Sequence, residues 1–279
     1  PDLPLGKVEH QCGSALGVVG GGGCPRLADI GERRLERAHL DGRGEFDFDF
    51  AVLHAGDLAD QPAAGDDFVA LFDGIEPDPS CDTLERALEA ARKFGADAVV
   101  GLGGGSPLDM AKAVSVLLTN EGPLRSFFGV DLLSRRGLPK LLIPTTAGTG
   151  TEVTAVAIFS DHKEKLKMGI VSPFMVPDVA ILDPELTLSV PPLVTAYTGM
   201  DALVHAMEAY TSVNATSLSD MYAERALTLL FPHIRGAYAD GRNLAARSAM
   251  MEGSMLAGKA FAIAGTTAIR TSRDRPVRF

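Results

Sequence analysis

The sequence is poor in cysteine and has no run of about 18 apolar residues, the length that a membrane-spanning helix needs. No membrane span or membrane partner is therefore expected. The three cysteines, Cys12, Cys24 and Cys81, are scattered and show no paired metal-ligand spacing. A disulfide framework is not expected, and a reducing cytoplasmic location is predicted. The first ten residues also lack a basic segment followed by an apolar one, so no signal peptide is predicted.

The sequence also contains fewer basic than acidic residues. The 26 lysines and arginines against 36 aspartates and glutamates give a net charge of −10, which argues against a nucleic-acid partner. Small anions are not excluded, because backbone amides can bind them locally. Hydrophobic residues make up 46% and charged residues 22% of the 279 positions, as in an ordinary globular protein of one large or two smaller domains.

From residue 72 onward, strand and helix patterns alternate. A helix with Ser80 or Asp82 as its cap and its end at Gly95 precedes the apolar strand "ADAVVGLGGGS". The next helix, "SPLDMAKAVSVLLTN", is predicted to have Ser106 as its cap, Pro107 at its first position and Asp109 in its first turn. Further on, "LPKLLIPTTAGTGTEVTAVAIFS" predicts a strand, a polar loop, and then another strand or the start of a helix. This alternation over 72–185 predicts a parallel α/β sheet.

After Pro192 the patterns become helical, so we predict two domains, an α/β domain over 1–188 and a helical domain over 189–279. Residues 11–70 fit the first domain poorly. Within them, "EFDFDFAV" alternates apolar and acidic residues, as an exposed strand would.

Two glycine-containing loops follow predicted strands. In "GLGGGS" (residues 101–106), which we call the glycine loop, glycines before a helix allow close backbone approach and leave amides free for a pyrophosphate, although the loop departs from the usual dinucleotide fingerprint. In "PTTAGTGTE" (residues 144–152), which we call the threonine loop, hydroxyls and amides are crowded together. Each loop alone is also compatible with a simple tight turn. Their places at two strand ends of one sheet favour a ligand site.

The stretch "GMDALVHAMEAY" places Asp201 and His205 four residues apart in a predicted helix, so that both side chains lie on one face. A carboxylate and an imidazole in this arrangement are two ligands of a metal site. Taken alone, this pair more often consists of an ordinary surface carboxylate at Asp201 and an ordinary core histidine at His205.

Five motifs in order, "GADAVVGLGGGSPLDMAK", "IPTTAGTGTEVT", "PDVAILDPELT", "TGMDALVHAMEAYTS" and "MLAGKAF", resemble the iron-containing alcohol dehydrogenases over roughly residues 72–265. The resemblance implies a dinucleotide-binding α/β domain followed by an all-helical domain, the fold shared with dehydroquinate synthase. It implies NAD- or NADP-dependent interconversion of an alcohol and an aldehyde or ketone. It also implies a divalent metal, iron or zinc, that acts as a Lewis acid.

The same resemblance implies roles for individual residues. Asp201 and His205 match the first two metal ligands of the family. The positions that match cofactor-binding residues are Gly104, Gly105, Ser106, Asp109, Thr145, Thr146, Thr149, Lys167 and Asp78, the last of which stands where the family often has Asn. No general base is evident.

The family's two further ligands, both histidines, are missing. Arg270 stands at the first of these positions, and a guanidinium has no lone pair to offer a metal. His233 is the only histidine after His205, and its place on another helix makes it a poor substitute. We therefore expect a truncated or frameshifted form of the family at both ends, with uncovered apolar helix faces that favour a homo-oligomer.

Three functional interpretations stay open. The first is an active dehydrogenase of the iron type. The second is a catalytically inactive remnant that binds at most a nucleotide, because a catalytic metal site normally has three or more protein ligands. The third is a relative of glycerol dehydrogenase or dehydroquinate synthase. It is the least favoured, because the residues of the motifs fit the iron-containing alcohol dehydrogenases better.

Overall fold

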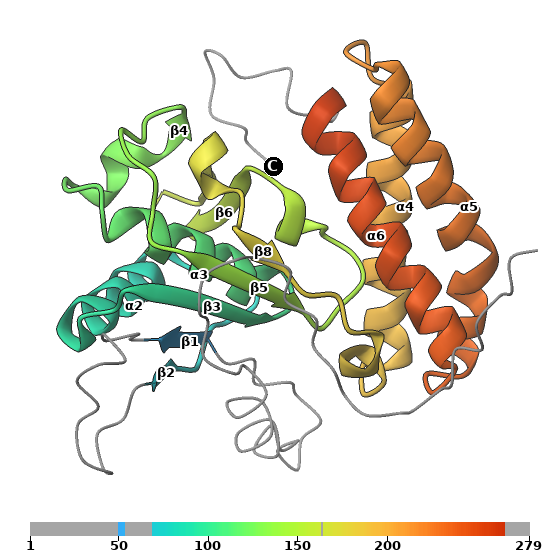
Figure 1. Ribbon diagram of the computed structural model, residues 1–279, viewed down its shortest axis with the longest axis horizontal. Coiled ribbons are helices and arrows are strands. Elements are labelled where there is room, and N and C mark those ends of the chain that lie inside the picture. Colours follow the sequence, from blue (N-terminus) through green and yellow to red (C-terminus); the bar gives the residue numbers. More distant parts are fainter. Residues whose placement is uncertain (1–49, 54–68, 163, 266–279) are drawn as a thin grey trace, which may run out of the picture. The chain divides into compact units, whose positions relative to one another are not determined.

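The computed structural model describes residues 50–53, 69–162 and 164–265, which all lie within one compact unit, Phe48–Phe279. Its larger sheet has five strands in the order β2-β1-β3-β5-β8 (Figure 1). These strands are β1 (Phe50–Leu53), β2 (Val69–Phe72), β3 (Ala98–Gly103), β5 (Lys140–Pro144) and β8 (Val179–Ala180). β3, β5 and β8 are parallel, which confirms the predicted parallel sheet, whereas β1 is antiparallel to both of its neighbours.

Helix α2 (Cys81–Phe94) begins and ends where the sequence predicts. The hydroxyl of Ser80 accepts a hydrogen bond from the amide of Thr83, and Gly95 ends the helix in the left-handed conformation with φ of 77°. Leu84 and Ala91 on its apolar face are buried in the core.

Helix α3 (Gly105–Leu117) begins earlier than predicted. Gly104, not Ser106, is its cap, and Asp109 lies beyond the first turn. The prediction was wrong because the glycine at position 105 already adopts the helical conformation against the neighbouring threonine loop. Gly104 has no side chain with which to cap the helix, so the first amides of α3 have no side-chain acceptor.

A second, three-stranded sheet has the order β4-β7-β6. Its strands are β4 (Gly129–Val130), β6 (Val156–Asp161) and β7 (Leu166–Val171). β6 and β7 pair in antiparallel register, so the segment predicted as a strand or a helix start is a strand. The chain also forms 3₁₀ turns at Leu124–Phe127, Thr151–Val153, Pro173–Met175 and Pro184–Thr187.

Beyond Pro191 the described chain is helical, as predicted. α4 (Pro192–Thr211), α5 (Ser217–Ala239) and α6 (Leu244–Ala264) contact one another and lie side by side in Figure 1. Their shared core is built mainly of alanine, which lets the helices approach closely; it includes Ala202, Ala206, Ala226, Leu230, Met250 and Ala257. No helix among the described residues combines the length and the apolar character that crossing a bilayer requires.

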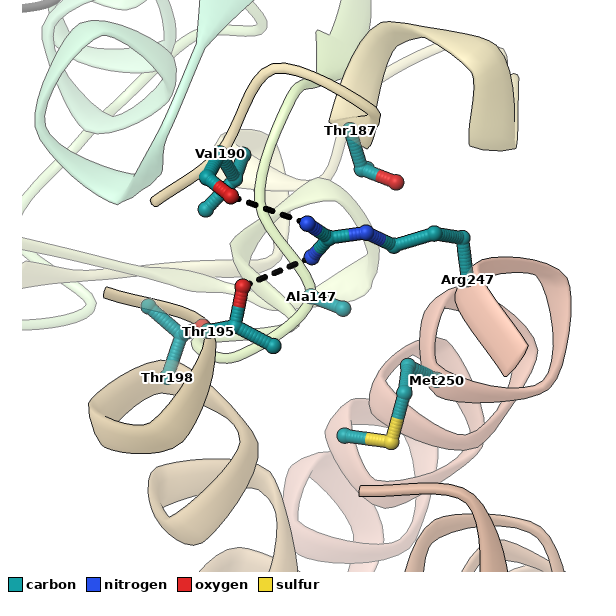
Figure 2. A pocket seen from close by; sticks show the side chains of 7 residues that line it. All are labelled: Ala147, Thr187, Val190, Thr195, Thr198, Arg247 and Met250. Atoms are coloured by element: carbon teal, nitrogen blue, oxygen red, sulfur yellow. Dashed lines mark hydrogen bonds between the residues drawn. The ribbon is translucent and has the colours of Figure 1, made fainter. Parts of the chain in front are cut away.

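A buried arginine fastens the turn before α4 to α6. Arg247 donates to the carbonyl of Val190 over 2.9 Å, to the hydroxyl of Thr195 over 2.7 Å and to the carbonyl of Gly241 over 2.9 Å. Figure 2 shows the first two of these bonds beside a small pocket lined also by Met250. Burial lowers the pKa of Arg247. Three neutral oxygens accept the hydrogen bonds that water would otherwise accept from the guanidinium, so the role of Arg247 is structural.

Candidate functional site

The two loops predicted from the sequence meet at the carboxyl ends of β3 and β5. The amide of Thr145 donates to the carbonyl of Gly103 over 2.8 Å. A Cβ atom added at Gly105 would lie 2.7 Å from Cγ2 of Thr149, and one added at Gly104 would lie 3.4 Å from Oγ1 of Thr146. The loops are therefore packed against each other, and position 105 has no room for a side chain.

This arrangement fits the diphosphate of a dinucleotide. The first amides of α3 point out of a helix N-terminus, where an anion is stabilised, and Gly104 leaves them uncapped. Oγ1 of Thr145 is buried and has no hydrogen-bond partner among the described residues. A buried polar atom without a partner is costly, so a ligand that bonds to it would be favoured.

Asp78, Ser106 and Lys167 come together beside the glycine loop. The amide of Asp78 donates to Oγ of Ser106 over 3.2 Å, and Nζ of Lys167 lies 3.0 Å from Oδ1 of Asp78. Both charged side chains are about half exposed, at 47% and 48%. Partial burial raises the pKa of Asp78, but hydrogen bonds from Lys167 and Ser160 outweigh that effect and hold it below its usual value.

Asp109 bonds to the end of the threonine loop and to β6. Its Oδ1 accepts a hydrogen bond from the hydroxyl of Thr151, and its Oδ2 accepts one from the amide of Ile158 over 2.9 Å. Both carboxylate oxygens are thus occupied within the chain. These contacts favour a positioning role for Asp109, and a direct contact with the cofactor stays a prediction.

Lys112 is a buried structural residue beside the site, for which the sequence predicts no role. Its side chain is fully buried, and its Nζ donates to the carbonyl of Thr151 over 3.0 Å, to the hydroxyl of the same residue over 2.6 Å and to the carbonyl of Val156. Burial lowers the pKa of Lys112, and Asp109, 3.4 Å away, acts in the opposite direction. No local pattern in the sequence reveals this role, because the acceptors lie at least 39 positions away along the chain.

Asp201 and His205 lie one turn apart on α4, as predicted. Nε2 of His205 lies 3.7 Å from Oδ1 of Asp201, close to the separation of about 3.4 Å between two ligands of a tetrahedral zinc ion. The His205 ring packs against Phe261 with centroids 4.9 Å apart, which fixes its orientation. Its Nδ1 is buried and has no hydrogen-bond partner among the described residues.

The rest of a metal site is not found in the part of the chain that the structure describes, which contains no group of three or more His, Cys, Asp or Glu side chains suited to one ion. The Nδ1 atom of His233 lies 2.8 Å from the carbonyl of Leu229 on its own helix, α5. Arg270 lies outside the described residues. Asp201 and His205 therefore fit a metal in type and spacing, but they supply fewer ligands than a catalytic site needs.

Comparison with known protein families gives two matches. Residues 54–184 match the model described as "Iron-containing alcohol dehydrogenase", and residues 195–271 match "Fe-containing alcohol dehydrogenase family, C-terminal". The first match includes both loops, and the second includes Asp201 and His205.

Individual relatives agree with these matches. The chain is 48% identical over 191 residues to a sulfoacetaldehyde reductase of Bilophila wadsworthia, covering 68% of this chain and 49% of that protein. It is 38% identical over 216 residues to an NAD-dependent methanol dehydrogenase of Bacillus methanolicus, covering 76% and 56%. The crystal structure of the Bifidobacterium kashiwanohense sulfoacetaldehyde reductase in complex with NAD⁺ matches with a TM-score of 0.67 at 39% identity, covering 69% and 52%. The chain thus spans about half the length of these relatives.

Proposed function

The chain belongs to the iron-containing alcohol dehydrogenase family, and from this membership we propose that it carries out hydride transfer between a nicotinamide cofactor and a small alcohol, aldehyde or ketone. The observation that supports this proposal most is the close packing of the glycine loop on the threonine loop at adjacent ends of parallel strands. Ligands of open α/β sheets bind at such strand ends.

In this proposal the chain's own residues bind and orient the cofactor. Backbone amides at Gly104, Gly105 and Ser106 bind the pyrophosphate, and the hydroxyls of the threonine loop, Thr145, Thr146 and Thr149, bind neighbouring polar groups. The nicotinamide accepts or donates the hydride. NAD is favoured over NADP because one relative is named NAD-dependent and a solved relative holds NAD⁺.

Lys167 would neutralise part of the cofactor's negative charge, and Asp78 would limit that effect because it forms an ion pair with Lys167. Asp109 and Lys112 would act at a distance, by holding residues 151–158 in place. Asp201 and His205 would bind a divalent metal, Fe²⁺ or Zn²⁺, which polarises the substrate oxygen when it is bound.

The second candidate function is nucleotide binding without catalysis. It is favoured by one observation, the presence of only two suitably placed metal ligands among the described residues. A cytoplasmic location stays a prediction.

The test is an anaerobic assay of the full chain with NADH, Fe²⁺ or Zn²⁺, and two aldehydes: sulfoacetaldehyde, which the name of one relative contains, and formaldehyde, the aldehyde that corresponds to the methanol in the name of another. We expect the parent chain to consume NADH, as measured by its absorbance. The variant Gly105→Ala should not consume NADH, whereas Gly236→Ala, a change in helix α5, should consume it as the parent does. NADH binding without turnover would support the second candidate. A folded chain that does neither would exclude both.

A further inference from the structure

The ammonium group of Lys112 lies among oxygen atoms that we call the ammonium cage. Its Nζ lies within 3.4 Å of six oxygens: the carbonyl and the hydroxyl of Thr151, the carbonyl and the hydroxyl of Thr154, the carbonyl of Val156, and Oδ1 of Asp109. An ammonium group has only three protons to donate, so the cage offers more acceptors than it can use. Oxygens in such excess can replace the hydration shell of a monovalent cation.

The charges around the ammonium cage favour a cation inside it. Lys112 is fully buried, the side chain of Asp109 is only 15% exposed, and Glu152 is 4% exposed. Burial lowers the pKa of Lys112, whereas the negative charges of Asp109 and Glu152 act in the opposite direction. Without the ammonium, these two acids would lie beside the cage with no positive charge in it. An emptied cage should therefore attract a cation.

Thr151 connects the ammonium cage to the proposed cofactor site. Its hydroxyl accepts a hydrogen bond from Nζ of Lys112 over 2.6 Å, and its amide donates to Oγ1 of Thr149 over 3.4 Å. Thr149 is the residue whose methyl group leaves no room for a side chain at Gly105. A cation in the cage can therefore act on the contact between the threonine loop and the glycine loop.

We propose that the ammonium cage is a cation-binding site which Lys112 fills with its own side chain, and that the cation in it holds the threonine loop against the glycine loop. Lys112 is then a positioning residue, which acts through Thr151 and Thr149 and does not touch the cofactor. When its side chain is shortened to alanine, the cage binds a free primary ammonium ion. The inference rests on the proposed function only in taking NAD⁺ as the ligand of the two loops.

The first experiment returns the missing cation to Lys112→Ala. The probe is n-propylammonium, because it has the three carbons and the nitrogen that this substitution removes. Tetramethylammonium at the same concentration is the control, since it has the same charge but no N–H group. We expect propylammonium to raise the urea midpoint of Lys112→Ala until the cage is saturated, whereas tetramethylammonium should not. Neither ion should change the parent chain in this way.

Hydrogen exchange of residues 144–152 then reports the loop contact in the absence of cofactor. We expect these amides to exchange about tenfold faster in Lys112→Ala than in the parent, and propylammonium to restore the parent rate. Exchange in the core of α5 under the same conditions controls for unfolding of the whole chain. NAD⁺ should bind about tenfold more weakly to Lys112→Ala, and propylammonium should restore this affinity as well.

Variants of Thr151 test the same connection if Lys112→Ala does not fold. Thr151→Val keeps the shape of the side chain but removes the hydroxyl that joins Lys112 to Asp109, whereas Thr151→Ser keeps the hydroxyl. Thr151→Val should speed exchange of residues 144–152 and weaken NAD⁺ binding, and Thr151→Ser should preserve both. Thr154→Val, which removes a hydroxyl 3.4 Å from Nζ, should also preserve both.

Three outcomes would overturn the proposal. The first is parent-like exchange of the threonine loop in folded Lys112→Ala or in Thr151→Val. The second is equal recovery with propylammonium and tetramethylammonium, because the effect would then be one of salt. The third is recovery of the urea midpoint without recovery of the loop, since Lys112 would then be structural only. A parent chain that binds no NAD⁺, in which the loop still responds as expected, would refute the proposed function and leave this inference standing.

Discussion

At the scale of single residues, Asp78 lowers the positive charge beside the glycine loop, because it forms an ion pair with Lys167. Its φ of 61° lies in the left-handed region, which asparagine also tolerates, so Asp78→Asn preserves the backbone. The change removes the carboxylate that pairs with Lys167. We predict that NAD⁺ binds about two- to fivefold more tightly to this variant, the range expected for an exposed ion pair. Isothermal titration at low and high salt measures the effect.

The matched control is Asp131→Asn, which alters another aspartate with positive φ, 55°, that forms no ion pair with Lys167. It should leave the affinity for NAD⁺ unchanged. Equal or weaker binding by Asp78→Asn would show that Lys167 does not contact the cofactor's phosphates.

The carboxyl group of Glu76 makes the free energy of unfolding depend on pH in the acidic range. Partial burial raises the pKa of its carboxyl, but hydrogen bonds from Ser80 and Thr83 outweigh that effect and lower it from 4.5 to about 2. Below about pH 4.5 the unfolded state binds more protons at this group than the folded state does. The stability that Glu76 contributes is therefore present above that pH and is lost as the pH falls toward 2.

Urea unfolding between pH 3 and 6 measures this linkage. Glu76→Gln should unfold at lower urea than the parent chain at pH 6, and the difference should shrink as the pH falls. Glu89→Gln, an exposed change on α2, should show no such trend. A difference for Glu76→Gln that is constant with pH would contradict the assignment.

At the scale of elements, the contact between α3 and the threonine loop determines the shape of the proposed cofactor site. Gly105→Ala would place a methyl group 2.7 Å from Cγ2 of Thr149, so the loops must separate. We predict a loss of NAD⁺ affinity of tenfold or more. Thr149→Ser in the same chain removes the clashing methyl group and should restore much of the affinity. Unchanged affinity in Gly105→Ala would show that NAD⁺ does not bind between these loops.

Lys112 connects α3 to the segment that begins at Thr151. Lys112→Met removes the positive charge beside Asp109 and leaves the carbonyl groups of Thr151 and Val156 without this donor, so we predict a loss of about 3–5 kcal/mol in the free energy of unfolding. Lys93→Met, an exposed change on α2, should cost less than about 0.5 kcal/mol. Chemical denaturation of both variants measures the difference, and similar losses would contradict the structural role of Lys112.

The sequence predicts local features of these elements better than it predicts their partners. The cap at Ser80, the stop at Gly95 and the helical region after Pro191 follow from local chemistry and are confirmed. The start of α3 was predicted wrongly, because Gly104 and Gly105 are placed by the neighbouring loop. The role of Lys112 depends on acceptors at least 39 positions away, which no local pattern reveals.

At the scale of the described unit, the threonine loop connects the two kinds of structure. A Cβ atom at Gly148 would lie 2.7 Å from Cβ of Thr198 on α4, and one at Gly150 would lie 2.8 Å from Gly258 on α6. The loop that contacts the glycine loop on one side thus contacts the helices on the other. The domain boundary at 188, the form of the chain as a truncated or frameshifted family member, and its homo-oligomeric state stay predictions.

The central claim of the proposed function is that the glycine loop and the threonine loop bind NAD⁺ without help from a metal, for which the described residues offer only two ligands. The most direct test is calorimetric titration of the folded chain with NAD⁺ in EDTA. The claim predicts one NAD⁺ per chain without any metal, because the binding groups are backbone amides and threonine hydroxyls. A chain that keeps its helical circular dichroism but binds no NAD⁺, or binds it only when a metal is added, would contradict the claim.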